Sequence, residues 1–273
     1  MRIMINYLPI MIIYLFCVRI AFGCSNDVQD VLNKHFLNGG FPKGHPNVNI
    51  STFVLCKMNG RPMNIVETGT SAWGFDSTRL FDSYVREFGG SVYSVDKRAK
   101  AKEKLLAKGL MGNSTHLFVE DSLSFLGGIN SRIMASATNS SCKSSKDIDV
   151  WFLDSWDVNW HHSYPAAEHG FAEFQIIGNQ NILKSNTMLW IDDTPKDIET
   201  LVSVQGIGKQ KVGEDFLNKE GVMPGKGAFI VRFSKRGKGA DSHEGDKRNA
   251  DNISLKHEFR AIFHEYGIVM TLK

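Results

Sequence analysis

The amino-acid sequence predicts an α/β fold in which helices flank a doubly wound, mostly parallel sheet. Short apolar runs alternate with helical patterns from residue 64 to the end of the chain. This alternation is typical of β-α-β units, whose strands run parallel. Composition agrees, because 42% hydrophobic residues and only 7 prolines in 273 residues indicate a packed globule. A net charge of +3 gives no indication of a nucleic-acid partner.

The N-terminal residues have a different composition from the rest of the chain. Their apolar run, 5–18, is shorter than the roughly 20 residues that span a bilayer comfortably. The small residues Ala21 and Gly23 suit signal-peptidase cleavage before Cys24. We interpret 1–23 as a secretory signal, which predicts a secreted or lumenal protein. The alternative is membrane attachment through the apolar run, with a cytosolic catalytic domain.

Cysteines and sequons leave the compartment open. Outside the targeting segment the chain has Cys24, Cys56 and Cys142, so at most one intrachain disulfide forms. The glycosylation sequons are at Asn49, Asn113, Asn139 and Asn252. Chance gives about two such matches in a chain this rich in Asn, Ser and Thr, so four support a lumenal protein only weakly.

The chain divides into an N-terminal helix and loop, 24–59, and one large domain, 60–273. The predicted strands are 64–68, 92–95, 116–119, 150–154, 187–191, 228–233 and 268–272. A helix with one apolar face, over 77–88, lies between an N-cap at Asp76 or Ser77 and the stop signal Gly89. Two polar insertions interrupt the pattern, at 131–147 and 234–251.

The first strand runs into a turn that suits close approach by a ligand. Gly69 and Gly74 frame the segment "VETGTSAWGFDST", which opens the next helix. Such a turn is also common without a ligand. It does not contain the GxGxxG fingerprint of dinucleotide-binding proteins, which counts against a nicotinamide cofactor. Glu67, at the strand end, could hold an ammonium group.

The next two strand ends carry polar side chains as well. Asp96 ends the second strand, 29 residues after Glu67, and could accept both hydroxyls of a ribose or cap a helix. Asp121 and Ser122 follow the third strand and could bind an adenine edge or begin an ordinary helix. Taken together, these acids describe a pocket for a nucleoside with a positive group, which fits S-adenosylmethionine better than a dinucleotide.

The fourth and fifth strands end in a concentration of acids. "VWFLDSWDVNWHH" places Asp154 directly after a buried strand, and "LWIDD" places Asp192 and Asp193 after the next. Open α/β sheets bind ligands beyond the carboxyl ends of their strands, so these residues are expected at one site.

In this order and spacing the motifs "VETGTSAWGFDST", "VYSVD", "VEDSLSFL", "VWFLDSW" and "LWIDD" resemble class I S-adenosylmethionine-dependent methyltransferases. The resemblance is greatest to the O-methyltransferases of the catechol and caffeoyl-CoA type and covers about residues 60–195. It implies a Rossmann-like, seven-stranded sheet with an antiparallel last strand. The tail is similar too, as a strand at 228–233, a helix at 255–266 and a final strand at 268–272.

The resemblance also implies roles for individual residues. S-adenosylmethionine would be bound by Glu67, Gly69, Thr70, Gly74, Ser77, Asp96, Asp121, Ser122 and Trp156. A divalent cation, Mg²⁺ or Ca²⁺, would be bound by Asp154, Asp192 and Asp193. The family usually has asparagine where this chain has Asp193, which adds a negative charge.

One departure concerns the reaction itself. Asp157 stands where catechol-type enzymes place a lysine that takes the proton of the acceptor hydroxyl. Either His161 or His162 supplies the base, or the acceptor is not a catechol, or the site does not turn over. The expected function is metal-assisted O-methylation of a small hydroxylated molecule. The alternatives are a secreted or lumenal binding protein without activity and, third, a nicotinamide-dependent oxidoreductase.

Overall fold

The computed structural model describes residues 23–38, 45–70, 75–109, 111–136, 144–180, 183–205, 214–236 and 259–272. The expected signal or anchor and its apolar run lie outside the described residues, as do Gly74, Cys142, Asn139 and Asn252. In the described part of the chain, no helix is both long and apolar enough to cross a membrane.

Seven strands form one sheet in the order β3-β2-β1-β4-β5-β7-β6. They are β1 (Met63–Thr68), β2 (Gly90–Asp96), β3 (Thr115–Val119), β4 (Val150–Leu153), β5 (Met188–Ile191), β6 (Phe259–His264) and β7 (Ile268–Leu272). The first five are parallel, and β7 is antiparallel to both β5 and β6. This is the Rossmann-like sheet of class I methyltransferases, so the predicted fold class is confirmed.

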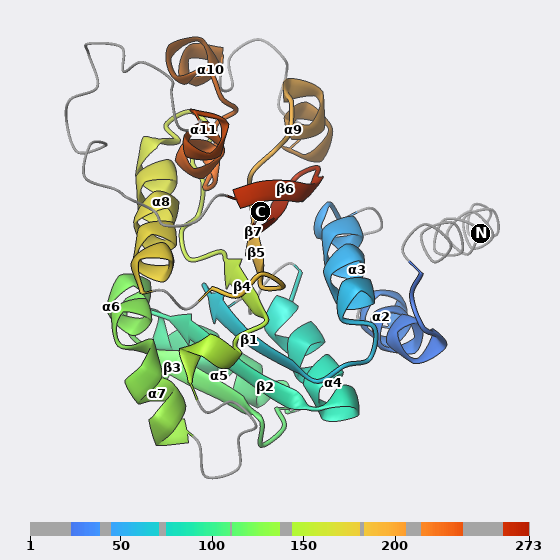
Figure 1. Ribbon diagram of the computed structural model, residues 1–273. Helices are drawn as coiled ribbons and strands as arrows, with labels where there is room; N and C mark the ends of the chain where they lie inside the picture. Colours follow the sequence, from blue (N-terminus) through green and yellow to red (C-terminus); the bar gives the residue numbers. More distant parts are fainter. Residues whose placement is uncertain are drawn as a thin grey trace, which may run out of the picture.

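Helices cover both faces of the sheet (Figure 1). The first group is α2 (Asn26–Asn38), α3 (Asn47–Met58) and α4 (Ser77–Phe88), which share one hydrophobic cluster with the strands. The second group is α6 (Ser122–Gly127), α7 (Ile129–Ser136), α8 (Tyr164–Asn179), α10 (Glu214–Glu220) and α11 (Ala228–Arg236), which pack in the other cluster. The other helices among the described residues are α5 (Ala99–Ala107), which packs on β2 and β3, α9 (Ile198–Gln205) and a short 3-10 helix (Ser145–Asp147).

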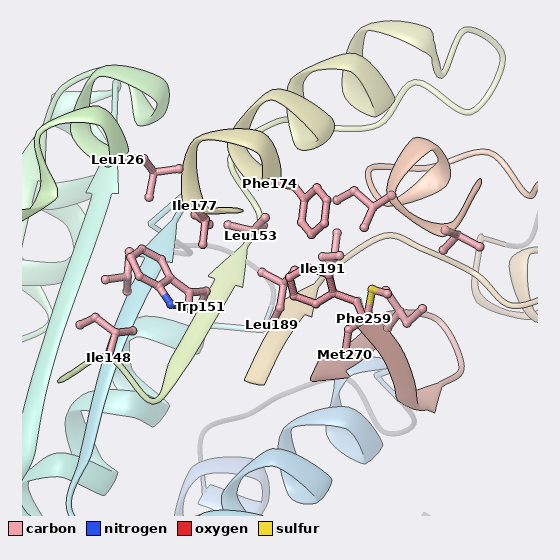
Figure 2. Packing of buried hydrophobic residues seen from close by; sticks show 14 of the residues in the cluster. Leu126, Ile148, Trp151, Leu153, Phe174, Ile177, Leu189, Ile191, Phe259 and Met270 are labelled. Atoms are coloured by element: carbon pink, nitrogen blue, oxygen red, sulfur yellow. The ribbon is translucent and has the colours of Figure 1, made fainter. Parts of the chain in front are cut away.

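The strand alternation explains why the core has two halves. In β4, Val150 and Phe152 point to the face of α3 and α4, whereas Trp151 and Leu153 point to the face of α8. Figure 2 shows the second face, where Trp151 and Leu153 lie in the same packed layer as Phe174 of α8. Because all four β4 side chains are buried, the strand reads as a continuous apolar run rather than an alternating one.

The predicted tail is wrong in its first two elements. Residues 228–233, expected as a strand, form helix α11, and the expected helix at 255–266 contains strand β6. In α11 the buried Ala228 and Val231 recur at helical spacing, although the run is rich in aromatic and β-branched residues. Strand β6 pairs with β7 across the short turn 265–267, so hairpin formation outweighs the helical pattern.

Two smaller expectations also change. Residues 131–136, assigned to a polar insertion, belong to helix α7. Helix α3 was not singled out in the sequence, although nine of its twelve residues are buried. Its apolar residues lie all round the helix, so no single amphipathic face identified it.

A disulfide joins Cys24, just before α2, to Cys56 in the last turn of α3, with a Cα–Cα distance of 4.6 Å. Cross-linking across 32 residues restricts the unfolded chain.

We expect Cys56→Ala to lower the free energy of unfolding by about 2–4 kcal/mol, measured by urea denaturation. The wild type measured in reductant should lose a similar amount. Equal stability of the variant and the oxidised wild type would contradict the pairing.

Candidate active site

The carboxyl ends of β1 and β4 lie against each other through their backbones. The amide of Asp154 donates to the carbonyl of Thr68 at 2.8 Å. Gly69 follows with a φ of +82°, and a Cβ there would lie 2.1 Å from the carbonyl oxygen of Asp154. Only glycine therefore fits this position. The turn after β1 and the segment after β4 form the centre of the candidate site.

A narrow pocket of about 20 Å³ lies on one side of this centre. Its walls are Gly69, Val95, Asp96, Lys97, Asp121, Ser122, Ser155, Trp156 and His169. Five of the residues predicted to bind the cofactor thus line one pocket, namely Gly69, Asp96, Asp121, Ser122 and Trp156. They come from the ends of β1, β2, β3 and β4, as expected for a ligand at the carboxyl edge of a parallel sheet.

Trp156 forms an exposed wall of this pocket, with 39% of its surface accessible. The ammonium of Lys97 lies 4.8 Å from its ring centre, and the imidazole of His169 lies 5.0 Å from it. His169 also bonds to the hydroxyl of Ser122 at 3.0 Å. Sequence reasoning missed His169, because it lies inside α8 and no motif marks it.

Asp96 and Asp121 already have partners in the structure. Both carboxylate oxygens of Asp96 accept hydrogen bonds from the Arg98 side chain, at 2.9 and 2.8 Å. Asp121 caps α6 by accepting from the amides of Leu123 and Ser124. A ribose at Asp96 would therefore have to displace or share Arg98.

Glu67 lies beneath the pocket, fully buried, rather than in its wall. Its carboxylate accepts hydrogen bonds from Ser77, from Thr78 at 2.6 Å and from Ser94 at 2.5 Å. Thr70 joins the same group through Ser94, at 2.8 Å. The predicted cofactor residues Glu67, Thr70 and Ser77 thus connect the start of α4 to β1 and β2 below the pocket.

Burial raises the pKa of Glu67 to about 7, although the three hydroxyls work in the opposite direction.

On the other side of the centre, Asp154, Asp192 and Asp193 each direct a carboxylate oxygen to one place, with these atoms within 4.8 Å of one another. Asp192 is 6% exposed, and Asn47, the first residue of α3, donates to its Oδ2 at 2.8 Å. Burial, and then Asp193, raises the pKa of Asp192 to about 6. Asn47 has no recognisable signal in the sequence.

The donor set of this acidic cluster fits a hard divalent cation. All three groups are carboxylates, the ligands that Mg²⁺ and Ca²⁺ prefer. The buried Oδ1 of Asp192 has no hydrogen-bond partner among the described residues. Burial also raises the pKa of Asp154, and the neighbouring acids add to this rise while Lys226 opposes it. A cation bound to these three carboxylates would therefore stabilise their ionised forms.

Lys226 supplies positive charge to the cluster. Its ammonium forms ion pairs with Asp154 and, at 2.9 Å, with Asp193, and the residue is only 3% exposed. Burial alone would lower the pKa of Lys226, but the three carboxylates raise it above its ordinary value. The sequence analysis did not single out Lys226, which lies between two glycines in "PGKG".

Asp157 and the two candidate bases, His161 and His162, form no hydrogen bond or ion pair with the acidic cluster in the described structure. The side chain of Asp157 is 97% exposed and lies 3.9 Å from Arg98. His161 and His162 are exposed, and neither lines the pocket at Trp156. A second pocket of about 370 Å³ lies among Thr194, α10, α11 and His264, and no residue of the cluster lines it.

Comparison with known proteins gives similarity at the level of structure. No family profile and no curated protein matches the chain by sequence. A candidate caffeoyl-CoA O-methyltransferase from Staphylococcus aureus has 15% identity and a TM-score of 0.44, over 95% of this chain and 97% of that one. Fibrillarin in its complex with Nop5p has 14% identity and a TM-score of 0.38, over 77% and 71%. The fold assignment itself comes from the strand order.

The buried Glu67 predicts a pH dependence of stability. Between about pH 4.5 and 7 the unfolded chain releases the Glu67 proton while the folded chain keeps it, so stability falls over this window. Glu67→Gln cannot titrate and should lack this fall. We expect the stability difference, wild type minus variant, to decrease from pH 5 to 7 and then level off, as measured by urea denaturation. Parallel curves for the two proteins would contradict the raised pKa.

Proposed function

We propose that the protein is an S-adenosylmethionine-dependent methyltransferase that methylates a hydroxyl group of a small molecule. The observation that carries the proposal is the segment after β4. Trp156 faces the pocket of predicted cofactor residues, while Asp154, two residues earlier, belongs to the acidic cluster. A methyl donor and a methyl acceptor would therefore be held on the two sides of one short segment.

Methyl transfer requires little beyond this placement of the methyl donor and the methyl acceptor. The acceptor hydroxyl releases its proton to solvent, its oxygen attacks the methyl carbon of the sulfonium, and the electron pair of the broken carbon–sulfur bond stays on sulfur. Catalysis then depends on holding the two reactants in line and close together. A divalent cation on Asp154, Asp192 and Asp193 would bind the acceptor hydroxyl and lower its pKa. Trp156 would pack on the cofactor, and Glu67 and its hydroxyl partners would hold the turn beneath it.

A second candidate is a lumenal protein that binds a small molecule without turnover. Asp157 in place of the expected lysine favours it, as do the ion pairs that already occupy Asp96 and the acidic cluster. The disulfide supports the secretory route for either candidate, because disulfides persist in oxidising compartments. The two candidates differ in turnover of a hydroxylated acceptor.

Calorimetry with S-adenosylmethionine tests the cofactor site. We expect binding to the wild type and a loss of about 1.5–3 kcal/mol in Asp96→Ala, the range for a hydrogen bond to a charged group. Glu120→Gln is the matched control, since Glu120 also follows a strand but pairs with Arg132 outside the pocket. A wild type that binds NAD and not S-adenosylmethionine would favour the oxidoreductase. Equal losses in both variants would place the ribose elsewhere.

The secretory route predicts a site-specific glycosylation pattern. Asn113 is exposed, whereas the side-chain amide of Asn49 donates to Glu265 at 2.9 Å and is partly buried. After expression in a eukaryotic cell, Asn113→Gln should remove one glycan and Asn49→Gln none, as measured by mass before and after deglycosylation. No mass shift in the wild type would favour the anchored protein with a cytosolic domain.

A further inference from the structure

We propose that Lys226 is the resident cation of the acidic cluster, that Asp193 holds it there, and that a divalent cation binds only by displacing it. This inference rests on the proposed use of the cluster as a cation site, and it is independent of cofactor binding. Its basis is the pair of contacts from the Lys226 ammonium to Asp154 and Asp193.

The two positions cannot be filled together. Mg²⁺ lies about 2.0–2.1 Å from its oxygen ligands, so a cation bound by Asp154 and Asp193 through the oxygens that contact Lys226 Nζ would take the place of the ammonium. That ammonium is buried, and water does not separate it from its partners at these distances. Binding of the metal therefore requires that Lys226 leave the cluster.

Backbone packing fixes the lysine in this position. Gly225 has a φ of +135°, and a Cβ there would lie 2.0 Å from the carbonyl oxygen of Asp193. A Cβ on Gly170 of α8 would lie 2.5 Å from the carbonyl oxygen of Lys226 itself. The amide of Lys226 also donates to the Asp193 carbonyl at 3.1 Å. The backbone of Gly225 and Lys226 thus packs directly against Asp193, which follows β5. This contact places the Lys226 ammonium at the acidic cluster.

Charge explains why Asp193 and Lys226 belong together. With asparagine at 193 and a neutral residue at 226, the cluster would hold two carboxylates and one amide. Three carboxylates and one ammonium have the same net charge as two carboxylates and one amide. The additional acid at 193 is therefore matched by the additional cation at 226, 2.9 Å away.

The test is divalent-cation binding by four purified full-length proteins: the wild type, Lys226→Gln, the double variant Asp193→Asn/Lys226→Gln, and the control Lys196→Gln. Lys196 is an exposed lysine near the same strand end and contacts none of the three acids through its side chain in the described structure. Binding is measured with Mn²⁺ by electron paramagnetic resonance of the free ion, and melting temperature is measured with and without Mg²⁺.

We expect both Lys226 variants to bind Mn²⁺ at least about tenfold more tightly than the wild type. Lys226→Gln should melt lower than the wild type without metal, because three carboxylates lose their cation, and Mg²⁺ should reverse this loss. The double variant keeps the net charge of the cluster, so it should fold without metal even if the single variant does not. Adding Asp154→Asn to the double variant should abolish the gain in affinity.

Equal Mn²⁺ affinity in the wild type and the double variant would overturn the proposal, and so would failure of both to bind. An equal gain in Lys196→Gln would show that general surface charge is responsible, which would also overturn it. Calorimetry with S-adenosylmethionine on the same four proteins keeps the two proposals apart. If the wild type does not bind S-adenosylmethionine but the Mn²⁺ affinities are as expected, the proposed function is refuted and the role of Lys226 is not.

Discussion

The contact between the turn after β1 and the segment after β4 is the constraint on which the site depends. Gly69 lies so close to the Asp154 carbonyl that no side chain fits between them. This approach fixes the direction in which the chain leaves β4, and so it sets Asp154 and Trp156 on opposite sides. Parallel pairing of β1 with β4 provides the register, from Ile65 beside Val150 to Thr68 beside Leu153. The pocket and the acidic cluster thus depend on a backbone contact rather than on a side-chain bond.

Most of the acids at this edge of the sheet have a cation of their own. Arg98 holds Asp96, Arg132 holds Glu120, and Lys226 bridges Asp154 and Asp193. Three acids are held differently among the described residues: hydroxyl groups surround Glu67, backbone amides donate to Asp121, and Asn47 donates to Asp192. Any ligand that binds here must therefore exchange partners with an existing ion pair. The free energy of ligand binding is therefore the difference between the polar contacts that the ligand makes and the ion pairs that it breaks.

The sequence could predict the parallel half of the fold because its strands are apolar runs that end in polar residues at regular intervals. The same rule identified Asp96, Asp121, Asp154, Asp192 and Asp193, each at the end of a strand or within two residues of it. It failed for the 228–233 run, where residue type favoured a strand but spacing favoured a helix. Side chains delivered from distant segments, such as Asn47, His169 and Lys226, could not be predicted, because their roles depend on packing between elements.

Helix α3 links the periphery of the molecule to the acidic cluster. Its last turn is tied by the disulfide to the segment before α2, and its first residue, Asn47, holds Asp192. About 13 Å of helix separates these two ends, at 1.5 Å per residue. A fragment that began at β1 would keep the whole sheet and still lose one of the polar groups that orient the cluster. The candidate site therefore extends into the N-terminal helices, and a boundary drawn at the start of the sheet would cut through it.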